Sequence, residues 1–364
     1  MKPLYIGATL QDTGKTSTIC GLIQALHERD LNPGYMKPVG QRYIEYQGEN
    51  IDEDAVLFYE VFNMPDAPVQ MSPVAIERGF TRKYIFDPNP EPLEKKILSA
   101  SAKIAEKHPI TLVEGTGHAG VGACFSLSNA RVAQLLGAKV VIIAPGGIGK
   151  PIDEVAVSLA LFEKYNVEVI GVILNKVTPD KMHKINETVS KGMENLGTKL
   201  LGCIPYEQTL SRYTIGQVAE AFNYELICGH GHLGNHINHI VVAAMEPQNV
   251  MQYIQKSSII ITPGDRIDNI LLTLALSRST DFHDKLYSGG LILTGGLKPD
   301  PTILDLLKKS DIPTLTTKED TFTVSARMKD LAFKIQTFDR DKIAKTLPLV
   351  KDNVNIDYIL EQLK

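Results

Sequence analysis

The sequence lacks a marked excess of either charge: 364 residues carry a formal net charge of −4. There is no basic field to favour nucleic acid or an anionic membrane surface, so we expect neither as a partner and expect small anions to be bound by local groups. No apolar run reaches the roughly 18 residues that a membrane-spanning helix needs. The N-terminus has no signal-peptide pattern. These absences predict a soluble, cytoplasmic protein.

Metal-binding and disulfide patterns are also missing. The four cysteines lack CxxC spacing, which argues against a zinc ribbon or a disulfide framework and favours reduced, buried thiols; they are Cys20, Cys124, Cys203 and Cys228. Histidines at positions 230, 232, 236 and 239 lie among Gly and Asn, with no Cys or acidic partner in the stretch. We interpret this stretch as a polar loop rather than a metal site.

Short apolar runs alternate with amphipathic stretches over the first 205 residues. The runs, which we expect to be strands, are Leu4–Ala8, Gly34–Val39, Ile110–Val113, Val140–Ala144, Val169–Leu174 and Leu200–Ile204. The stretches, which we expect to be helices, include Thr16–Arg29, Glu91–Lys107, Ile152–Lys164 and Lys181–Leu196. Continuous apolar strands separated by helices predict a doubly wound, mostly parallel α/β sheet covered on both faces.

The rhythm of strands and helices restarts after Pro205 and predicts a second, smaller α/β domain. We place the first domain at residues 1–212, the second at 213–330, and a helical C-terminal tail at 331–364. The tail carries two weak helical patterns, at Asp339–Leu347 and Ile356–Leu363.

The segment from Tyr5 to Ser17 follows a strand and opens a helix, as a phosphate-binding loop requires. Its end, Thr13-Gly14-Lys15-Thr16-Ser17, predicts backbone amides around the phosphates of ATP, Lys15 on the β- and γ-phosphates, and the Thr16 hydroxyl on Mg²⁺. The common spacing would need glycine at Thr9, whereas the glycines here are Gly7 and Gly14.

Two acidic segments are candidate magnesium ligands. Glu114, followed by Gly115, ends the third apolar strand, at the sheet edge where doubly wound domains bind ligands. Asp54 lies in Asp52-Glu-Asp-Ala55 before a helix, where acids are equally common as caps. Lys37, at the end of the second strand, would emerge at the same edge and could neutralise a γ-phosphate or an acidic substrate.

These residues together resemble the dethiobiotin synthetase family. The shared features are the loop ending Gly14-Lys15-Thr16, Tyr-x-Lys-Pro-Val at 35–39, Asp54, Val-Glu-Gly at 113–115 and Gly-Val-Ile-Leu-Asn at 171–175. The resemblance implies Mg²⁺ ligation by Thr16, Asp54 and Glu114, phosphate contact by Lys15, and adenine contact by Asn175. It also implies contact of Lys37 with the reacting carbamate and phosphate, so Lys15 and Lys37 are the candidate catalytic residues.

The resemblance does not extend to the substrate. Gln41 replaces a small hydroxyl residue, and Pro145–Lys150 does not match the loop that binds the substrate carboxylate in those dimers. Nucleotide binding therefore carries over, and the diamine substrate does not.

The second domain resembles the DRTGG domain, with Asp265 and Arg266 in one segment and Thr294, Gly295 and Gly296 in another. Both segments follow predicted strands, so they could face each other across one sheet edge. One interpretation is a site for an anionic or nucleotide effector, built from glycine amides and the Arg fork. The other is structural: Asp265 caps a helix and pairs with Arg266, and the glycines serve a tight turn.

This order of domains resembles the N-terminal region of long bacterial phosphate acetyltransferases. Because the chain ends before an acetyltransferase domain would begin, we expect it to lack that activity. A homodimer or higher homo-oligomer is expected from the resemblance.

Two functions remain open. The first is a nucleotide-responsive regulator or slow ATPase, which the DRTGG-like half favours. The second is an ATP-dependent ligase or phosphoryl-transfer enzyme acting on a small anionic substrate. A dinucleotide-binding oxidoreductase is disfavoured, because no GxGxxG follows the first strand.

Overall fold

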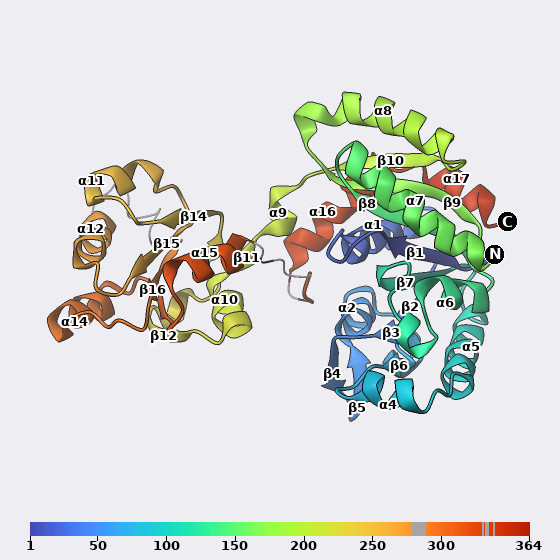
Figure 1. Ribbon diagram of the computed structural model, residues 1–364, viewed down its shortest axis with the longest axis horizontal. Helices are drawn as coiled ribbons and strands as arrows, with labels where there is room; N and C mark the ends of the chain where they lie inside the picture. The colour runs from blue at the N-terminus through green and yellow to red at the C-terminus, as the bar shows by residue number, and fades with distance from the viewer. Residues whose placement is uncertain (279–288, 330, 332–334, 338) are drawn as a thin grey trace. The chain divides into compact units, whose positions relative to one another are not determined.

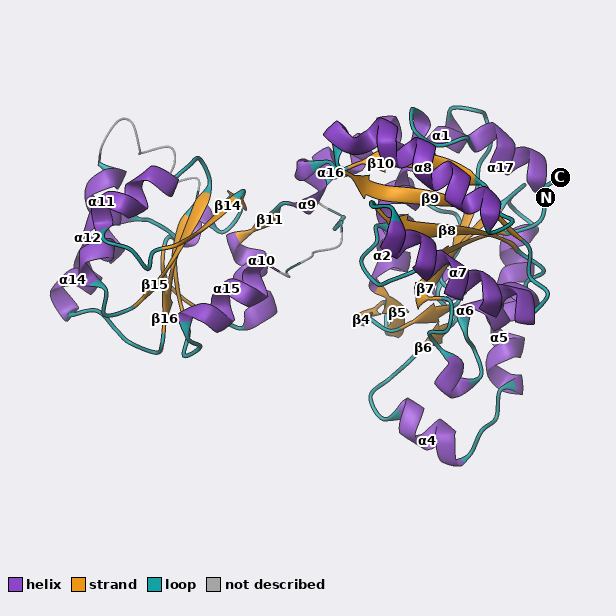
Figure 2. Ribbon diagram, turned by 45° about the horizontal axis from the view of Figure 1, so that its top comes forward, coloured by secondary structure: helices purple, strands orange, loops and turns teal. Residues whose placement is uncertain are grey.

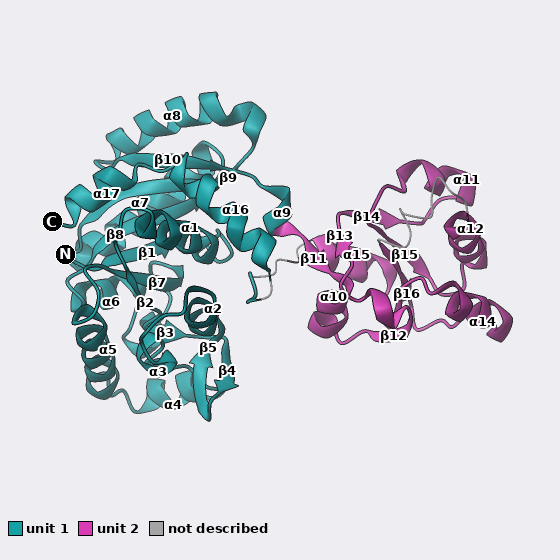
Figure 3. Cartoon of the chain, turned by 180° about the vertical axis from the view of Figure 1, so that it is seen from behind, with its two compact units in different colours: residues 1–210, 334–364 teal, residues 211–333 magenta. Residues whose placement is uncertain are grey.

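The computed structural model describes residues 1–278, 289–329, 331, 335–337 and 339–364. The chain divides into two compact units, residues 1–210 with 334–364 and residues 211–333 (Figure 3). The C-terminal segment is thus not a separate tail: residues 334–364 belong to the first unit, and Val350, Val354, Ile356, Ile359 and Leu363 are buried in its core.

The first unit is built on a six-stranded sheet in the order β10-β9-β8-β1-β7-β2 (Figure 1). All its strand pairs are parallel. The strands are β1 Leu4–Ala8, β2 Gly34–Met36, β7 Thr111–His118, β8 Lys139–Pro145, β9 Val169–Val177 and β10 Leu200–Pro205. The doubly wound parallel sheet predicted from the apolar runs is confirmed.

Helices cover both faces of this sheet (Figure 2). Side chains of α1 Lys15–His27, α2 Glu53–Phe62, α16 Arg340–Lys351 and α17 Ile356–Gln362 share one buried core. Those of α5 Glu91–Ala105, α6 Asn129–Leu135, α7 Gly149–Lys164 and α8 Met182–Asn195 share the other. Leu4 and Ile6 point into the first core and Tyr5 into the second, as the two-residue period of a strand dictates.

Several small elements of the first unit were not predicted. A hairpin joins β4 Tyr43–Tyr46 to β5 Glu49–Asp52 through Gln47 and Gly48, both at positive φ, the geometry that two-residue hairpin turns favour. The others are β3 Val39–Gly40, β6 Val74–Ala75, α3 Pro68–Met71, α4 Phe80–Phe86, η1 Ala123–Phe125, η2 Pro179–Lys181 and α9 Gln208–Ser211. The hairpin ends at Asp52, directly before α2.

Helix α16 lies against α1, the helix that begins at the predicted phosphate loop. A Cβ atom at Gly21 of α1 would come within 2.4 Å of the Thr346 carbonyl oxygen, so only glycine permits this approach. Gln24 of α1 donates to the Thr346 hydroxyl at 2.8 Å. The sequence pattern stops at Leu347, before a proline, yet α16 continues through Pro348 because Val350 is buried against α1.

The second unit contains a five-stranded sheet in the order β12-β17-β16-β15-β14. Only the β12–β17 pair is antiparallel within it. Its strands are β12 Glu225–Cys228, β14 His239–Val242, β15 Ser258–Pro263, β16 Gly290–Thr294 and β17 Thr314–Thr316. A separate two-stranded sheet pairs β11 Tyr213–Thr214 with β13 His236–Ile237. The second, smaller α/β architecture is confirmed.

Helices lie on both faces of this sheet as well. One core includes residues of α11 Pro247–Val250, α12 Ile267–Ser277 and α14 Pro301–Ser310, and the other those of α10 Ile215–Phe222 and α15 Thr321–Lys329. The short 3-10 turns are η3 His230–His232 and η4 Met251–Tyr253. Asn238 separates β13 from β14, and its amide donates to the Ser257 carbonyl at 2.9 Å. Across the described ranges, we find no helix both long and apolar enough to cross a membrane.

Candidate nucleotide-binding site

The loop between β1 and α1 is held from the side by the end of β9. Asn175 donates its side-chain amide to the Thr13 carbonyl at 2.8 Å, and the Lys176 ammonium donates to the Asp12 carbonyl at 2.9 Å. Gly14 has φ 92°, and a Cβ there would lie 2.1 Å from the Asn175 amide nitrogen. Asn175 therefore supports the loop itself, and its contact with adenine stays a prediction.

Lys15, Thr16 and Ser17 form the first turn of α1, as the sequence predicted. The Thr18 hydroxyl donates to the Gly14 carbonyl at 2.9 Å and ties the loop to the helix. The start of a helix carries a partial positive charge and amides without helical partners, which suits a phosphate group.

Glu114 lies in β7 opposite Ile6 of β1. Its Oε1 accepts from the Thr16 hydroxyl at 2.9 Å, and its Oε2 accepts from the Tyr35 hydroxyl at 2.8 Å. Strands β2 and β7 and helix α1 thus contribute to one buried cluster, and Thr16 and Glu114, which lie 98 positions apart in the chain, are in direct contact.

Tyr35 was not anticipated as a site residue. Its ring stacks on Phe58 of α2 at 4.0 Å between centroids, and its hydroxyl reaches Glu114. Burial, together with the neighbouring carboxylates, raises the pKa of Tyr35 well above its usual value, so the hydroxyl remains a donor. The shared Tyr-x-Lys motif could have indicated Tyr35 as a site residue. An aromatic residue in an apolar strand, however, usually packs in the hydrophobic core.

Lys37 follows β2 and is 4% exposed. Its ammonium pairs with Asp54, lies 3.2 Å from Asp52 Oδ1 and 3.8 Å from Glu114 Oε1. Burial lowers the pKa of Lys37, but Asp54, Glu114 and Asp52 together raise it well above its usual value. One ammonium therefore faces three buried carboxylates.

The acidic segment before α2 serves two purposes. Asp52 is the N-cap of α2, because its side chain accepts from the Asp54 amide at 3.0 Å. Asp54, in the first turn, instead pairs with Lys37. The capping alternative thus applies to Asp52, and magnesium ligation by Asp54 stays a prediction.

Gly115 packs where a side chain would not fit, since a Cβ there would lie 2.8 Å from the Tyr5 ring and 3.0 Å from Asn129 Oδ1. Asn129 accepts from the Tyr5 hydroxyl at 2.7 Å and from the Thr116 amide at 3.1 Å. The Thr116 hydroxyl donates to the Val39 carbonyl at 2.7 Å. These contacts fix the end of β7 beside the acidic cluster.

The donor set fits a hard divalent cation. Thr16, Asp54 and Glu114 offer oxygen ligands, which Mg²⁺ prefers, and all three are at most 9% exposed. In the part of the chain that the structure describes, no group of three or more His, Cys, Asp or Glu side chains is positioned to hold a metal. A magnesium site here would therefore combine the hydroxyl of Thr16 with carboxylates, and Mg²⁺ stays a prediction.

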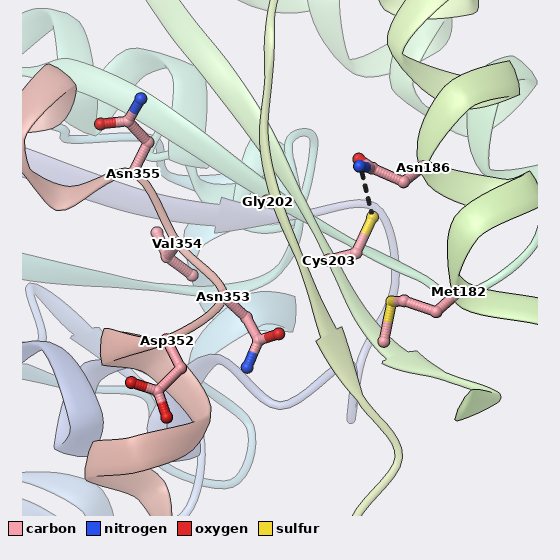
Figure 4. A pocket seen from close by; sticks show the side chains of 8 residues that line it. All are labelled: Met182, Asn186, Gly202, Cys203, Asp352, Asn353, Val354 and Asn355. Atoms are coloured by element: carbon pink, nitrogen blue, oxygen red, sulfur yellow. Dashed lines mark hydrogen bonds between the residues drawn. The ribbon is translucent and has the colours of Figure 1, made fainter.

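A pocket of about 330 Å³ lies elsewhere in the first unit, where residues 352–355 cross β10 (Figure 4). The Cys203 thiol there points toward Asn186, 3.7 Å from its Oδ1. Burial raises the pKa of Cys203 to about 11, which keeps the thiol protonated and unreactive at neutral pH. None of the predicted nucleotide-site residues lines this pocket.

In the second unit, the two DRTGG-like segments follow the neighbouring strands β15 and β16. The structural interpretation included a pair between Asp265 and Arg266, but the guanidinium instead binds Asp268 at 2.8 and 2.9 Å and also donates to the Met245 carbonyl. The N-cap of α12 is Arg266 rather than Asp265, and no side chain caps it. Asp268 is reachable from Arg266 because both lie at the first turn of the helix.

The Thr-Gly-Gly segment is tied to the loop after β17. Thr294 shares a hydrogen bond of 2.7 Å with the Thr321 hydroxyl. The amides of Gly295 and Gly296 donate to the carbonyls of Glu319 and Thr317 at 2.7 and 2.8 Å, with φ of 80° and 66°. These bonds use the glycine amides within the fold, in agreement with the tight-turn interpretation. An effector site stays a prediction.

Comparison with known protein families places a domain boundary near residue 215, close to the point where the first compact unit ends and the second begins. The AAA domain family matches residues 2–214, more than half of the chain. The chain belongs to this AAA domain family. The DRTGG domain matches residues 217–331. The chain thus joins a dethiobiotin-synthetase-like P-loop domain to a DRTGG domain, as the resemblance implied.

Curated relatives match almost the whole of this chain within longer chains. The phosphate acetyltransferase of Nitratidesulfovibrio vulgaris is 27% identical over 364 residues, covering 97% of this chain and 50% of the relative. The phosphate acetyltransferase of Synechocystis is 23% identical over 370 residues, covering 99% of this chain and 52% of the relative. The chain spans about half the length of these relatives.

Among solved structures, the MinC:MinD cell division complex of Aquifex aeolicus matches 58% of this chain and 84% of its own, with 15% identity and a TM-score of 0.37. The CBS and DRTGG domains of a Clostridium perfringens pyrophosphatase, complexed with diadenosine tetraphosphate, match 40% of this chain and 50% of their own, with 23% identity and a TM-score of 0.25.

Proposed function

We propose that the first unit binds Mg-ATP and acts as a slow ATPase whose nucleotide state is transmitted to the DRTGG domain. The observation that carries nucleotide binding is the 2.9 Å hydrogen bond between Thr16, at the start of α1, and Glu114, on the neighbouring strand. This places a hydroxyl and a carboxylate together beneath the loop, where a P-loop protein holds magnesium.

The remaining site residues have complementary roles. Amides from Thr13 to Ser17 and the Lys15 ammonium would bind the phosphates, while Thr16, Asp54 and Glu114 would hold Mg²⁺. The ion would neutralise charge on the terminal phosphates. Lys37 would add a second positive charge near the γ-phosphate.

Calorimetric titration with Mg-ATP tests this proposal on the intact chain. Wild-type protein should bind, and a Lys15→Ala variant of unchanged fold should not. At 100 times Kd, bound nucleotide should stabilise the protein by about 2.7 kcal/mol. Equal binding by both proteins would refute the assignment of the loop.

Helix α2 supports the regulatory part of the proposal. It carries Asp54 in its first turn, and Leu57 one turn later is buried with Ile335 and Ile343. Leu210 packs against the same group. Residue 210 is the last of the first unit before the second begins, and Ile335 lies just after the chain returns. A shift of α2 on nucleotide binding would therefore reach both connections to the DRTGG domain.

Hydrogen exchange measures this coupling directly. Saturating Mg-ATP should change the exchange of amides in 339–351, and Leu57→Ala should weaken that response while leaving the Mg-ATP affinity close to wild type. Nucleotide binding without any change in these amides would refute the regulatory role and leave the binding site intact.

The alternative is an ATP-dependent ligase or phosphoryl-transfer enzyme, favoured by the position of Lys37 inside the acidic cluster. An anionic nucleophile would meet the γ-phosphate between Lys37 and the loop after β7. Phosphate release that depends on an added diamine, carboxylate or bicarbonate would support it. Basal hydrolysis unaffected by any of them favours the regulator. Formation of a homodimer or higher homo-oligomer remains a prediction for the same preparation.

A further inference from the structure

Asp52 contacts Lys37, yet it is not among the residues assigned to nucleotide or metal. It ends β5, is 1% exposed and caps α2. Its Oδ1 lies 3.2 Å from the Lys37 ammonium and also accepts from the Asp54 amide at 3.0 Å. A capping residue needs only the amide contact, so the ion pair with Lys37 is an additional feature.

Two further contacts fix the position of Asp52. Its own amide donates to the Ser72 hydroxyl at 3.2 Å. A Cβ atom at Gly40 would lie 2.6 Å from the Asp52 Cβ and 2.8 Å from its Oδ2, so the backbone of β3 packs directly against the side chain. The carboxylate therefore cannot shift without moving β3 or the hairpin.

The charges around Lys37 would be redistributed when the metal enters. Asp54 and Glu114 are the carboxylates proposed for Mg²⁺, and both also pair with Lys37. A divalent cation bound to them competes for their charge and repels the ammonium. Asp52 lies outside the proposed ligand set, so its hold on Lys37 would persist.

We propose that Asp52 is a positioning residue that retains Lys37 at the nucleotide site when Asp54 and Glu114 are engaged by magnesium. This inference rests on the proposed Mg-ATP site. Without metal, three carboxylates share the ammonium, and Asp52 is dispensable. With metal, Asp52 alone anchors Lys37 beside the γ-phosphate.

The test is the affinity of Asp52→Asn for ATP with and without Mg²⁺, measured by calorimetry. Asparagine keeps the N-cap and the shape but removes the charge. With Mg²⁺ the affinity should fall about tenfold, as expected for losing a charge-assisted contact. With a chelator the affinity should be unchanged or slightly higher, because one negative charge is gone. A combined Asp52→Asn and Lys37→Met variant should bind Mg-ATP no more weakly than Lys37→Met alone.

Glu53→Gln is the matched control, because it removes a negative charge one residue away. Glu53→Gln should change the ATP affinity by the same factor with Mg²⁺ and with a chelator. If Asp52→Asn has a markedly lower melting temperature than the wild type, Asp52→Ser is the second variant, because serine is also a favourable N-cap residue. Equal loss of ATP affinity in both conditions, or no loss with Mg²⁺, overturns the role of Asp52. Failure of wild-type protein to bind Mg-ATP overturns the proposed function as well, so the two failures are distinguishable.

Discussion

Replacing Lys37 with methionine tests how much the buried ammonium stabilises the folded first unit. Methionine has a similar length but no charge, so Asp52, Asp54 and Glu114 would lose the ammonium that they share. Removing one partner of a buried ion pair costs about 3–5 kcal/mol. For a unit of this size, that lowers the melting temperature by about 6–20 °C.

The loss should depend on pH with a defined sign. In the wild type, the pKa of Lys37 is raised, so its contribution is complete below the usual lysine value and is lost only as the pH rises through the higher folded value. In Lys37→Met, the uncompensated carboxylates should acquire raised pKa values and become protonated in mild acid. The variant should therefore recover stability between pH 8 and pH 5.

Magnesium gives an independent readout of the same charges. A divalent cation can replace the missing ammonium, so millimolar Mg²⁺ without nucleotide should raise the melting temperature of Lys37→Met more than that of the wild type. Thermal unfolding at pH 8 and pH 5, with Mg²⁺ or a chelator, measures all three effects.

Lys139→Met is the control, because Lys139 pairs at 3.0 Å with Glu168, whose side chain is 57% exposed. Losing such a surface pair should cost less than about 1 kcal/mol. This account of the acidic cluster would be refuted if the melting temperatures of Lys37→Met and Lys139→Met differed by less than about 2 °C. An identical response of both variants to Mg²⁺ and pH would also refute it.

Two further variants test the supports of the site. Tyr35→Phe removes the 2.8 Å hydrogen bond to Glu114 and should cost about 1.5–3 kcal/mol in urea unfolding, since the acceptor is charged and buried; a loss below about 0.5 kcal/mol would contradict the contact. Gly21→Ala would place a Cβ 2.4 Å from the Thr346 carbonyl and should cost about 1–3 kcal/mol through overpacking, with faster hydrogen exchange in α16. Unchanged exchange there would mean that α16 does not depend on this close approach.

Local patterns predicted the main strands and helices because each carries its signal within a few residues. The apolar run Leu4–Ala8 coincides with β1, and the amphipathic stretch Ile152–Lys164 lies within α7. The hairpin before α2 was missed although Gln47-Gly48 lies between two four-residue strands, because neither YIEY nor ENID alternates apolar with polar residues. The turn itself was the signal that could have found it.

The sequence indicated individual residues of the candidate site but not all of the contacts between them. Motif spacing indicated Lys15, Thr16 and Glu114, and the structure brings Thr16 and Glu114 into contact. The pairing of Lys37 with Asp52 was not foreseeable, because it depends on the hairpin that returns the chain to β2. The place of α16 was hidden for a similar reason, since it packs against Gly21 of α1, more than 300 residues earlier in the chain.

The sequence by itself determined the two α/β domains and the chemistry of the phosphate loop, because strand periodicity and a Gly-Lys-Thr turn are properties of neighbouring residues. Only the tertiary structure decided which charges face one another. The structure places one ammonium among three carboxylates and packs a C-terminal helix against the helix that follows the loop. Both contacts join segments that are distant in the chain, so no local sequence pattern could predict them.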